Sequence, residues 1–262
     1  MEGYRFDNKT VLITGASGGV GEGLCRYFCE RGAHILVVGR NSELLRQLAD
    51  KLGKNCLPVA ADVTDLPALG AAIRPVVKDV GHVEILVNNA GAASATTLSE
   101  LTAEAWQRDL SLNLTGAYHC VEVVKEAMLA AAEGVIINIG SVNSLLTLGH
   151  PAYSAAKAGL ISYTKSLAVE YGPKGIRANL LNLGTIRTQA WNARVEKNPD
   201  IFNELKKWYP LRDFPEPRDV AAVCGFLASA DARFITGAII PVDAGLTAGN
   251  PPMAGELTLE DF

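Results

Sequence analysis

Short apolar runs recur along the chain at intervals that suit alternating strands and helices. They cover residues 11–14, 35–38, 56–60, 85–88, 135–139, 177–181 and 238–242. Longer segments with helical periodicity separate them, so the chain consists of repeated strand–helix–strand units. This pattern predicts an α/β fold: a mostly parallel, doubly wound sheet of about seven strands with helices on both faces.

The carboxyl ends of such strands carry the residues of greatest interest. In an open parallel sheet, the ligand crevice lies outside these ends, where the strand order reverses. Right-handed crossovers bring the same edge of every strand to this crevice. Residues at the ends of the runs, or one or two positions beyond them, are therefore candidates for a site: Gly15, Gly39, Asp62, Asn88 and Ser141.

A glycine-rich segment follows the first apolar run. Residues 15–21 read Gly-Ala-Ser-Gly-Gly-Val-Gly and lead into a helical pattern with Leu24 and Phe28 on one face. Glycines in a strand–turn–helix context allow a pyrophosphate to approach the backbone, and the helix N-terminus favours its negative charge. The segment therefore predicts a dinucleotide-binding site.

Tyr153 and Lys157 are four residues apart in a segment of helical character. That spacing puts a phenol and an ammonium group on one helix face. A nearby positive charge lowers the pKa of a phenol, which makes it usable as a general acid or base near neutral pH. Alone, such a pair is also compatible with ordinary surface packing.

Composition bounds the class of protein. The chain has 262 residues, of which 48% are hydrophobic, with a formal charge of −4 and a pI near 5.6. We expect a single domain over residues 1–262, without nucleic-acid binding, because no basic block is present. The start lacks the apolar core of a signal peptide, and no apolar run approaches the ~18 residues of a membrane span, so we expect a cytoplasmic location and no membrane association. Five scattered cysteines and four unclustered histidines predict neither a disulfide framework nor a metal site.

Two segments look less regular than the rest. Residues 184–218 contain four prolines and connect the sixth run to the next helix over a length that suggests a substrate lid. Residues 250–262 follow the last run as a C-terminal tail, either frayed or packed on a neighbouring subunit.

Six motifs in order resemble the short-chain dehydrogenase/reductase family over nearly the whole chain, in the single-domain branch that includes 3-oxoacyl-acyl-carrier-protein reductases. They are the glycine motif at 14–21, Asp62-Val63, Asn-Asn-Ala-Gly at 88–91, Asn113, Ser141 and the Tyr153/Lys157 pair. The resemblance implies a Rossmann-type fold and an NAD(P)-dependent enzyme that acts on CH–OH and C=O groups.

The resemblance also implies roles for individual residues. Tyr153 would exchange a proton with the substrate oxygen, Lys157 would hold the cofactor ribose, and Ser141 would bind the substrate carbonyl. Asn113 would anchor a water linked to Lys157, and Thr188 would meet the nicotinamide carboxamide. The implied cofactor-binding residues are Gly15, Ser17, Gly19, Val20, Gly21, Arg40, Asp62, Val63, Asn89, Ala90, Gly91, Tyr153, Lys157, Gly184, Ile186 and Thr188.

The chain departs from the family pattern in two places near this site. The gap from Ser141 to Tyr153 is one residue shorter than usual, which leaves Ser144 as an alternative active-site serine. Asn113 could likewise serve only to satisfy backbone groups at a helix break. Leu183 stands where the family commonly has proline, which frees the backbone beside the nicotinamide.

The end of the second run bears on cofactor choice. Sites that prefer NAD carry an acidic residue there, which bonds the ribose 2′-hydroxyl. Here Arg40 occupies this region, and a guanidinium bonds a 2′-phosphate well. We therefore expect NADP(H) to be preferred over NAD(H), the alternative being that Arg40 stacks on adenine or points to water.

The expected function is an NADP(H)-dependent oxidoreductase that interconverts a ketone and a secondary alcohol. An NAD(H)-dependent alcohol or polyol dehydrogenase is the alternative within the fold, and a non-catalytic nucleotide sensor is the alternative outside this class. The substrate is open among 3-oxoacyl thioesters, sugars or polyols and cyclic ketones. By analogy with relatives we expect a homo-oligomer, a dimer or a homotetramer.

Overall fold

The computed structural model describes residues 4–261. The first three residues of the expected domain and Phe262 of the expected tail lie outside the described residues.

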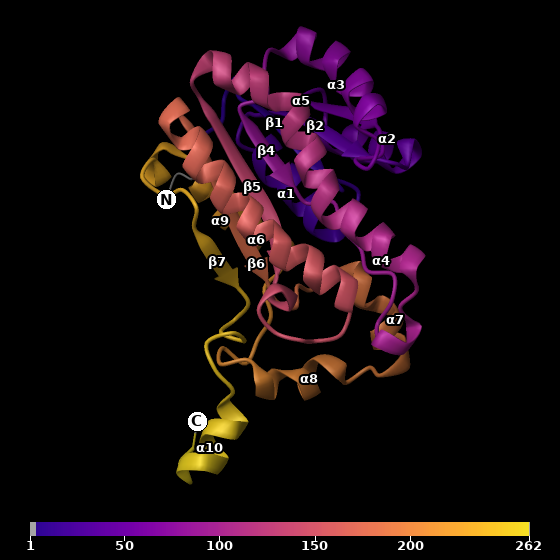
Figure 1. Ribbon diagram of the computed structural model, residues 1–262, viewed down its shortest axis with the longest axis vertical. Helices are drawn as coiled ribbons and strands as arrows, with labels where there is room; N and C mark the ends of the chain where they lie inside the picture. Colours follow the sequence, from indigo (N-terminus) through magenta and orange to yellow (C-terminus); the bar gives the residue numbers. More distant parts are fainter. Residues whose placement is uncertain (1–3, 262) are drawn as a thin grey trace.

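One parallel sheet of seven strands forms the centre of the molecule (Figure 1). Its spatial order is β3-β2-β1-β4-β5-β6-β7, so the order reverses between β1 and β4. The strands are β1 Thr10–Thr14, β2 His34–Gly39, β3 Cys56–Ala60, β4 Ile85–Asn88, β5 Gly134–Ser141, β6 Ile176–Leu183 and β7 Ile239–Val242. The predicted doubly wound α/β sheet is confirmed, with each predicted strand within two residues of its observed bounds.

Helices cover both faces of the sheet. The longer ones are α1 Gly19–Cys29, α2 Ser42–Leu52, α3 Leu66–Val80, α4 Ala103–Leu110, α5 Gly116–Ala131, α6 Pro151–Tyr171 and α9 Pro217–Ala228. The side chains of α1, α2 and α9 join one apolar cluster with one face of the sheet, and those of α3 and α5 join a second cluster with the opposite face. The core is therefore divided into two layers by the sheet, as expected for a doubly wound fold.

Helix α1 illustrates how the sequence builds this packing. Its buried residues Gly21, Leu24, Cys25 and Phe28 recur at intervals of three or four, which places them on one face. Phe28 is fully buried, and the centroid of its ring lies 4.9 Å from that of the Phe6 ring. Burial of one such side chain contributes about 1.5–3 kcal/mol, so the helix that follows the glycine segment is firmly anchored.

The segment 184–218 contains short helices rather than a plain loop. They are the 3₁₀ turn η5 Gln189–Trp191, α7 Asn192–Lys197, α8 Ile201–Leu205 and the turn η6 Lys206–Trp208. In Figure 1 they lie at the end of the molecule near the carboxyl end of β6. This placement puts them beside the crevice that the strand order predicts.

The tail forms a helix, α10 Pro251–Thr258. Asn250 caps its N-terminus, and the Asn250 side chain accepts a hydrogen bond from Met253 N. It lies apart from the sheet in Figure 1, and Met253, Leu257 and Leu259 are exposed on it.

Within residues 4–261, no helix combines the length and the apolar character required to cross a bilayer.

All five cysteines are unpaired, and four of them are buried in the apolar layers. These four therefore contribute packing.

Candidate functional site

Two hollows meet at the carboxyl ends of β1 and β4. One has a volume of about 370 Å³ and is lined by Ser141, Tyr153 and Lys157, and the other has about 300 Å³ and is lined by Arg40 and Asp62. Both are also lined by Gly15, Gly18 and Gly91, so they form one crevice across the glycine segment. This is the switch point of the sheet, where a dinucleotide is expected.

Two glycines of this segment lie where a side chain would not fit. Gly15 has φ of 62°, and a Cβ there would lie 2.9 Å from the Cα of Ala90. A Cβ on Gly19 would lie 2.6 Å from the Cβ of Thr188. Both distances are below normal contact, so this backbone requires glycine at both positions.

The first turn of α1 begins at Gly19, within the glycine segment. Its backbone N–H groups and partial positive charge face the crevice, which suits a pyrophosphate. A cradle of glycines at a helix N-terminus, with one hollow on each side, fits an NAD(P) cofactor. Ser17 and Val20 line its walls, as do Gly21 and Val63.

Asn89 braces the glycine segment. Its side-chain Nδ2 donates to Thr14 O at 2.9 Å and to Gly15 O at 3.1 Å. The backbone N–H groups of Asn89 and Ala90 both donate to Thr14 Oγ1 at 3.0 Å. The Asn-Asn-Ala-Gly motif therefore shapes the segment, and the Asn89 amide is already engaged in doing so.

Arg40 and Asp62 line the adenine-side hollow. The Asp62 carboxylate accepts hydrogen bonds from Thr64 N at 2.9 Å and Thr64 Oγ1 at 2.8 Å. Burial works against ionisation, but these hydrogen bonds and the charge of Arg40 keep the pKa of Asp62 below its usual value. Among the described residues, Arg40 itself makes no hydrogen bond or ion pair, and it is exposed. Its guanidinium is therefore free to bind a ligand.

Tyr153 and Lys157 lie on α6 at the other end of the crevice, as their spacing predicts. Lys157 is 3% exposed, and its Nζ donates to the carbonyl of Ile139 on β5 at 2.7 Å. The same Nζ lies 5.6 Å from the centroid of the Tyr153 ring. The pair thus faces the crevice from one helix face, with the lysine fixed to the sheet.

Burial governs the protonation of this pair. It raises the pKa of Tyr153, while hydrogen bonding with Ser141 acts in the opposite direction. Burial lowers the pKa of Lys157 to about 8. The lowered pKa expected for Tyr153 is therefore not found in this structure, because burial raises it.

Ser141, rather than Ser144, belongs to this crevice. Ser141 ends β5 and lines the same hollow as Tyr153. The Ser144 hydroxyl instead donates to Ser141 O at 2.7 Å and accepts from Asn182 Nδ2 at 3.0 Å. The shortened gap between Ser141 and Tyr153 therefore leaves both side chains on the crevice wall.

Asn113 is buried behind Gly91 in a π-helical turn, η2 Ser111–Thr115. Its Nδ2 donates to Ala92 O at 2.8 Å and Asp109 O at 2.9 Å, and its Oδ1 accepts from Ala92 N at 3.2 Å. The side chain is thus engaged with backbone groups on both its amide nitrogen and its amide oxygen. A π turn frees backbone carbonyls and is often found at functional sites.

The remaining wall comes from the segment after β6. Leu183, Gly184, Ile186, Thr188 and Trp191 line the hollow that contains Tyr153. Tyr209, by contrast, is buried, and its hydroxyl lies 2.8 Å from Thr185 Oγ1. Trp191 is therefore the aromatic side chain of this segment that faces the crevice.

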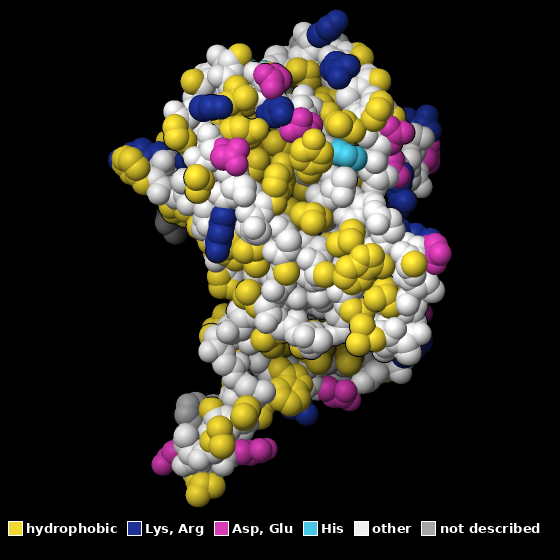
Figure 2. Space-filling view, viewed as in Figure 1, with side chains coloured by type: hydrophobic (Ala, Val, Ile, Leu, Met, Phe, Trp, Pro, Cys, Tyr) yellow, Lys and Arg dark blue, Asp and Glu magenta, His cyan; other side chains and the backbone are white. Residues whose placement is uncertain are grey.

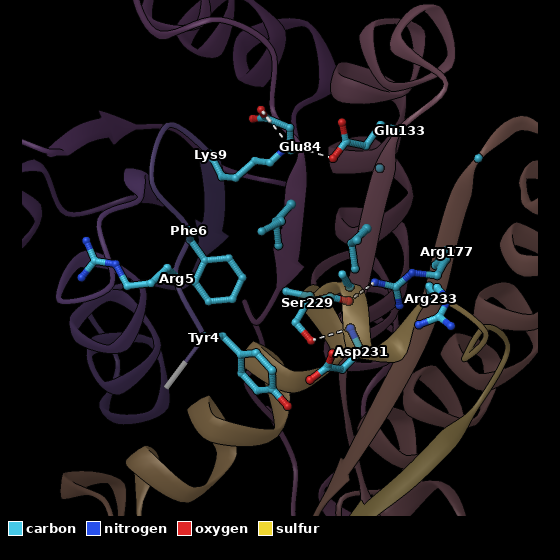
Figure 3. A pocket seen from close by; sticks show the side chains of 16 residues that line it. Tyr4, Arg5, Phe6, Lys9, Glu84, Glu133, Arg177, Ser229, Asp231 and Arg233 are labelled. Atoms are coloured by element: carbon cyan, nitrogen blue, oxygen red, sulfur yellow. Dashed lines mark hydrogen bonds and ion pairs between the residues drawn. The ribbon is translucent and has the colours of Figure 1, made fainter. Parts of the chain in front are cut away.

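A larger cavity of about 490 Å³ lies at the opposite edge of the sheet, where the strands begin (Figure 3). There Lys9 Nζ lies 2.7 Å from Glu133 Oε1 and 3.7 Å from Glu84 Oε1. Arg177 donates to the carbonyls of Leu227 at 2.6 Å and Ser229 at 3.3 Å, close to the end of α9. Lys9 and Arg177 in this cavity thus hold neighbouring elements together, and we take the crevice at the carboxyl ends of the strands as the candidate site.

Several residues that approach the site were missed by the sequence analysis. Ile139 O accepts from Lys157, Asn143 lies in the turn after Ser141, and Asn182 contacts this turn through Ser144. A backbone carbonyl and side chains brought together by separate strands leave no local pattern in a sequence.

Comparisons with known proteins agree with this geometry. A family model described as enoyl-(acyl carrier protein) reductase matches residues 15–247. An uncharacterised oxidoreductase of Schizosaccharomyces pombe is 42% identical over 258 residues, which cover 97% of each chain. The meso-2,3-butanediol dehydrogenase of Serratia marcescens is 35% identical and covers 94% of this chain and 97% of its own.

Among solved structures, an oxidoreductase of the short-chain dehydrogenase/reductase family from Burkholderia thailandensis superimposes with a TM-score of 0.92. It is 51% identical, with 97% of this chain and 98% of that chain covered.

Proposed function

This chain belongs to the short-chain dehydrogenase/reductase family of NAD(P)-dependent oxidoreductases that act on alcohols and ketones, and we propose that it prefers NADP(H) and uses Tyr153 as its general acid and base. The observation that carries the proposal is the meeting of Ser141, Tyr153 and Lys157 in one hollow that adjoins the glycine segment. A proton donor and a second hydroxyl then face one substrate oxygen, with a fixed cation beside the phenol.

Tyr153 exchanges the proton. When bound, the nicotinamide supplies or accepts the hydride. In reduction, the protonated phenol donates to the oxygen of the ketone as negative charge develops there. The raised pKa of Tyr153 keeps the phenol protonated at neutral pH, which suits this direction. In alcohol oxidation the phenolate accepts the proton, so this direction is favoured by higher pH.

Ser141 stabilises the charge on the same oxygen. Its hydroxyl lies on the crevice wall at the end of β5, a rigid strand buried over its whole length. A donor fixed on such a strand needs little reorganisation during the reaction. Ser141 therefore orients the substrate carbonyl toward Tyr153.

Lys157 has two assignments in this proposal. Its ammonium donates to Ile139 O, and its remaining protons are directed to the ribose hydroxyls of the cofactor. Its charge also favours the phenolate of Tyr153 once water is excluded. The other residues assigned to hold the cofactor are Gly19 and Val20 at the pyrophosphate, with Ile186 and Thr188 at the nicotinamide.

Arg40 supports the preference for NADP(H). Its guanidinium is exposed at the rim of the adenine-side hollow and lacks an acidic partner within hydrogen-bonding distance. Among residues 4–261, Asp62 is the carboxylate that lines this hollow, and it is engaged by Thr64. A 2′-phosphate would thus meet an available cation rather than a competing acid.

We propose small secondary alcohols, including vicinal diols, and the matching ketones as substrates. The relative named for meso-2,3-butanediol acts on such a diol, and the hollow beside Tyr153 has a volume of about 370 Å³. The segment 184–218, which contributes Trp191 to this hollow, is proposed as the lid that closes over the substrate.

A homo-oligomer, as a dimer or a tetramer, is also part of the proposal. Large apolar side chains are exposed on the face formed by α4, α5 and α6, among them Trp106 at 40%, Tyr118 at 43% and Val169 at 75% (Figure 2). Such a patch on one face supports contact with a second copy. A location in the cytoplasm stays a prediction.

Parallel titrations of the purified chain with NADPH and NADH, followed by a panel of ketones and alcohols, test the proposal. Tighter NADPH binding with turnover on at least one member is the expected result. Tight binding without turnover on a broad panel would favour the nucleotide-sensing alternative instead.

A further inference from the structure

The turn that follows β5 holds the hydroxyl of Ser141. This turn is the 3₁₀ segment η3 Val142–Ser144, and Ser141 is its N-terminal cap. Asn143 N donates to Ser141 Oγ at 3.2 Å, and Asn143 Oδ1 lies 3.4 Å from the same oxygen. The first contact fixes the hydroxyl oxygen, and the second is long enough to be exchanged for a substrate oxygen.

The backbone of Ser141 is held from the neighbouring strand. Ser144 Oγ donates to Ser141 O at 2.7 Å, and Asn182 Nδ2 on β6 donates to Ser144 Oγ at 3.0 Å. Asn182 is fully buried and lies opposite Gly140 in the sheet register. A Cβ on Gly140 would collide with Asn182 Oδ1, so the absence of a side chain at 140 is what admits this asparagine.

Asn143 connects the same turn to α6. Its Nδ2 donates to Gly149 O at 2.9 Å and to Ser154 Oγ at 3.2 Å. Ser154 follows Tyr153 in the chain and closes the first turn of the helix by donating to His150 O at 2.9 Å. One side chain thus joins the end of β5 to the helical turn that carries the phenol.

We propose that Asn143, Ser144 and Asn182 form a clamp of positioning residues that holds the Ser141 hydroxyl against Tyr153 for proton transfer. The inference rests on the proposed function, because it concerns the proton donor and its partner serine. These residues act through Ser141 and need not touch the substrate. A displacement of such a group by about 1 Å reduces turnover by up to ~10²-fold.

The clamp has a consequence for the phenol that a merely structural role lacks. In the proposed arrangement, a hydrogen bond from Ser141 to the phenol oxygen opposes the rise in the pKa of Tyr153 that burial causes. If the clamp is loosened, this hydrogen bond weakens and the pKa of Tyr153 rises.

The test is Ser144→Ala, measured by turnover and by titration of Tyr153. With a ketone from the panel, kcat is expected to fall about 10-fold, with the Kd of NADPH unchanged within twofold. The Tyr153 pKa is followed from the ¹³C NMR signal of its ring Cζ, assigned with Tyr153→Phe, and is expected to rise. Ser144→Thr keeps the hydroxyl and is expected to restore both values.

Ser166→Ala is the matched control, since Ser166 Oγ also donates to a backbone carbonyl of α6, that of Ser162 at 3.3 Å, on an exposed face. If Ser144→Ala does not fold, Asn143→Ser serves instead, because Asn143 is only half-buried and serine is too short to reach Gly149 O. A folded clamp variant with unchanged kcat and Tyr153 pKa would overturn the inference. If the unmodified chain reduces no ketone, the proposed function fails, while the titration still decides whether the clamp holds Ser141 against Tyr153.

Discussion

Lys157 donates a hydrogen bond to the carbonyl of Ile139 across 2.7 Å, which ties α6 to β5 two residues before Ser141. This carbonyl is the only hydrogen-bonding partner of the ammonium among the described residues, and no carboxylate pairs with it. A buried cation without an anionic partner costs stability. Its retention is explained by the site, which needs a fixed positive charge beside Tyr153.

Replacement of Lys157 by methionine should therefore stabilise the fold and abolish activity. Methionine fills a similar volume without a charge, and we expect the free energy of unfolding to increase by about 1–2 kcal/mol at pH 7, within the range seen when buried charges are replaced. Urea denaturation of both proteins checks this. An equally stable or less stable variant would show that the buried ammonium does not lower the free energy of unfolding.

The pH dependence of this difference has a defined sign. Burial lowers the pKa of Lys157 to about 8 from its usual 10.5, so between these values the unfolded chain binds more protons than the folded one. The destabilising effect is complete below about pH 8 and fades as the pH rises toward 10.5. The advantage of Lys157→Met should shrink over this window, and a constant advantage would contradict the depressed pKa.

Replacement of Arg40 by aspartate should weaken NADPH binding far more than NADH binding. The variant places a negative charge where the 2′-phosphate is expected, and loss of one charge-assisted pair costs roughly 1.5–3 kcal/mol, or at least ~10-fold in Kd. Fluorescence titration with both nucleotides measures the ratio, and Arg40→Gln separates lost attraction from added repulsion. Equal losses for NADPH and NADH would remove Arg40 from the choice of cofactor.

Replacement of Gly91 by alanine should impair activity through crowding. The added Cβ would lie 2.7 Å from Asn113 Oδ1 and 3.4 Å from Lys157 Nζ, so the Asn113 side chain must move. We expect kcat/KM to fall by about 10- to 100-fold, since small displacements at a reacting centre are costly. Gly172→Ala is the matched control, because nothing lies within 4 Å of a Cβ there. Similar activity in both variants would mean that the site tolerates the shift.

The sequence predicts much of this molecule because many of its signals are local. Strand type and position follow from short apolar runs, and the glycine segment is recognisable because strand and helix patterns flank it. Tyr153 and Lys157 share a helix face at any location in a fold. Their assigned roles in catalysis stay predictions until the variants are measured.

Other features depend on contacts between distant segments. The helices within 184–218 are short and stabilised by packing, such as the Trp191 and Phe202 rings at 5.3 Å, so their sequence resembles a loop. The role of Ser144 depends on Asn182, which lies on another strand. The protonation of Tyr153 depends on burial, which the spacing of two residues does not convey.

The central claim is that Tyr153 transfers the proton, and Tyr153→Phe tests it most directly. Phenylalanine keeps the ring and removes the hydroxyl, so NADPH should bind within a few-fold of the unmodified chain. Turnover of a ketone should fall by at least ~10²-fold, the scale of a lost general acid. Turnover within a few-fold of the unmodified chain would contradict the account.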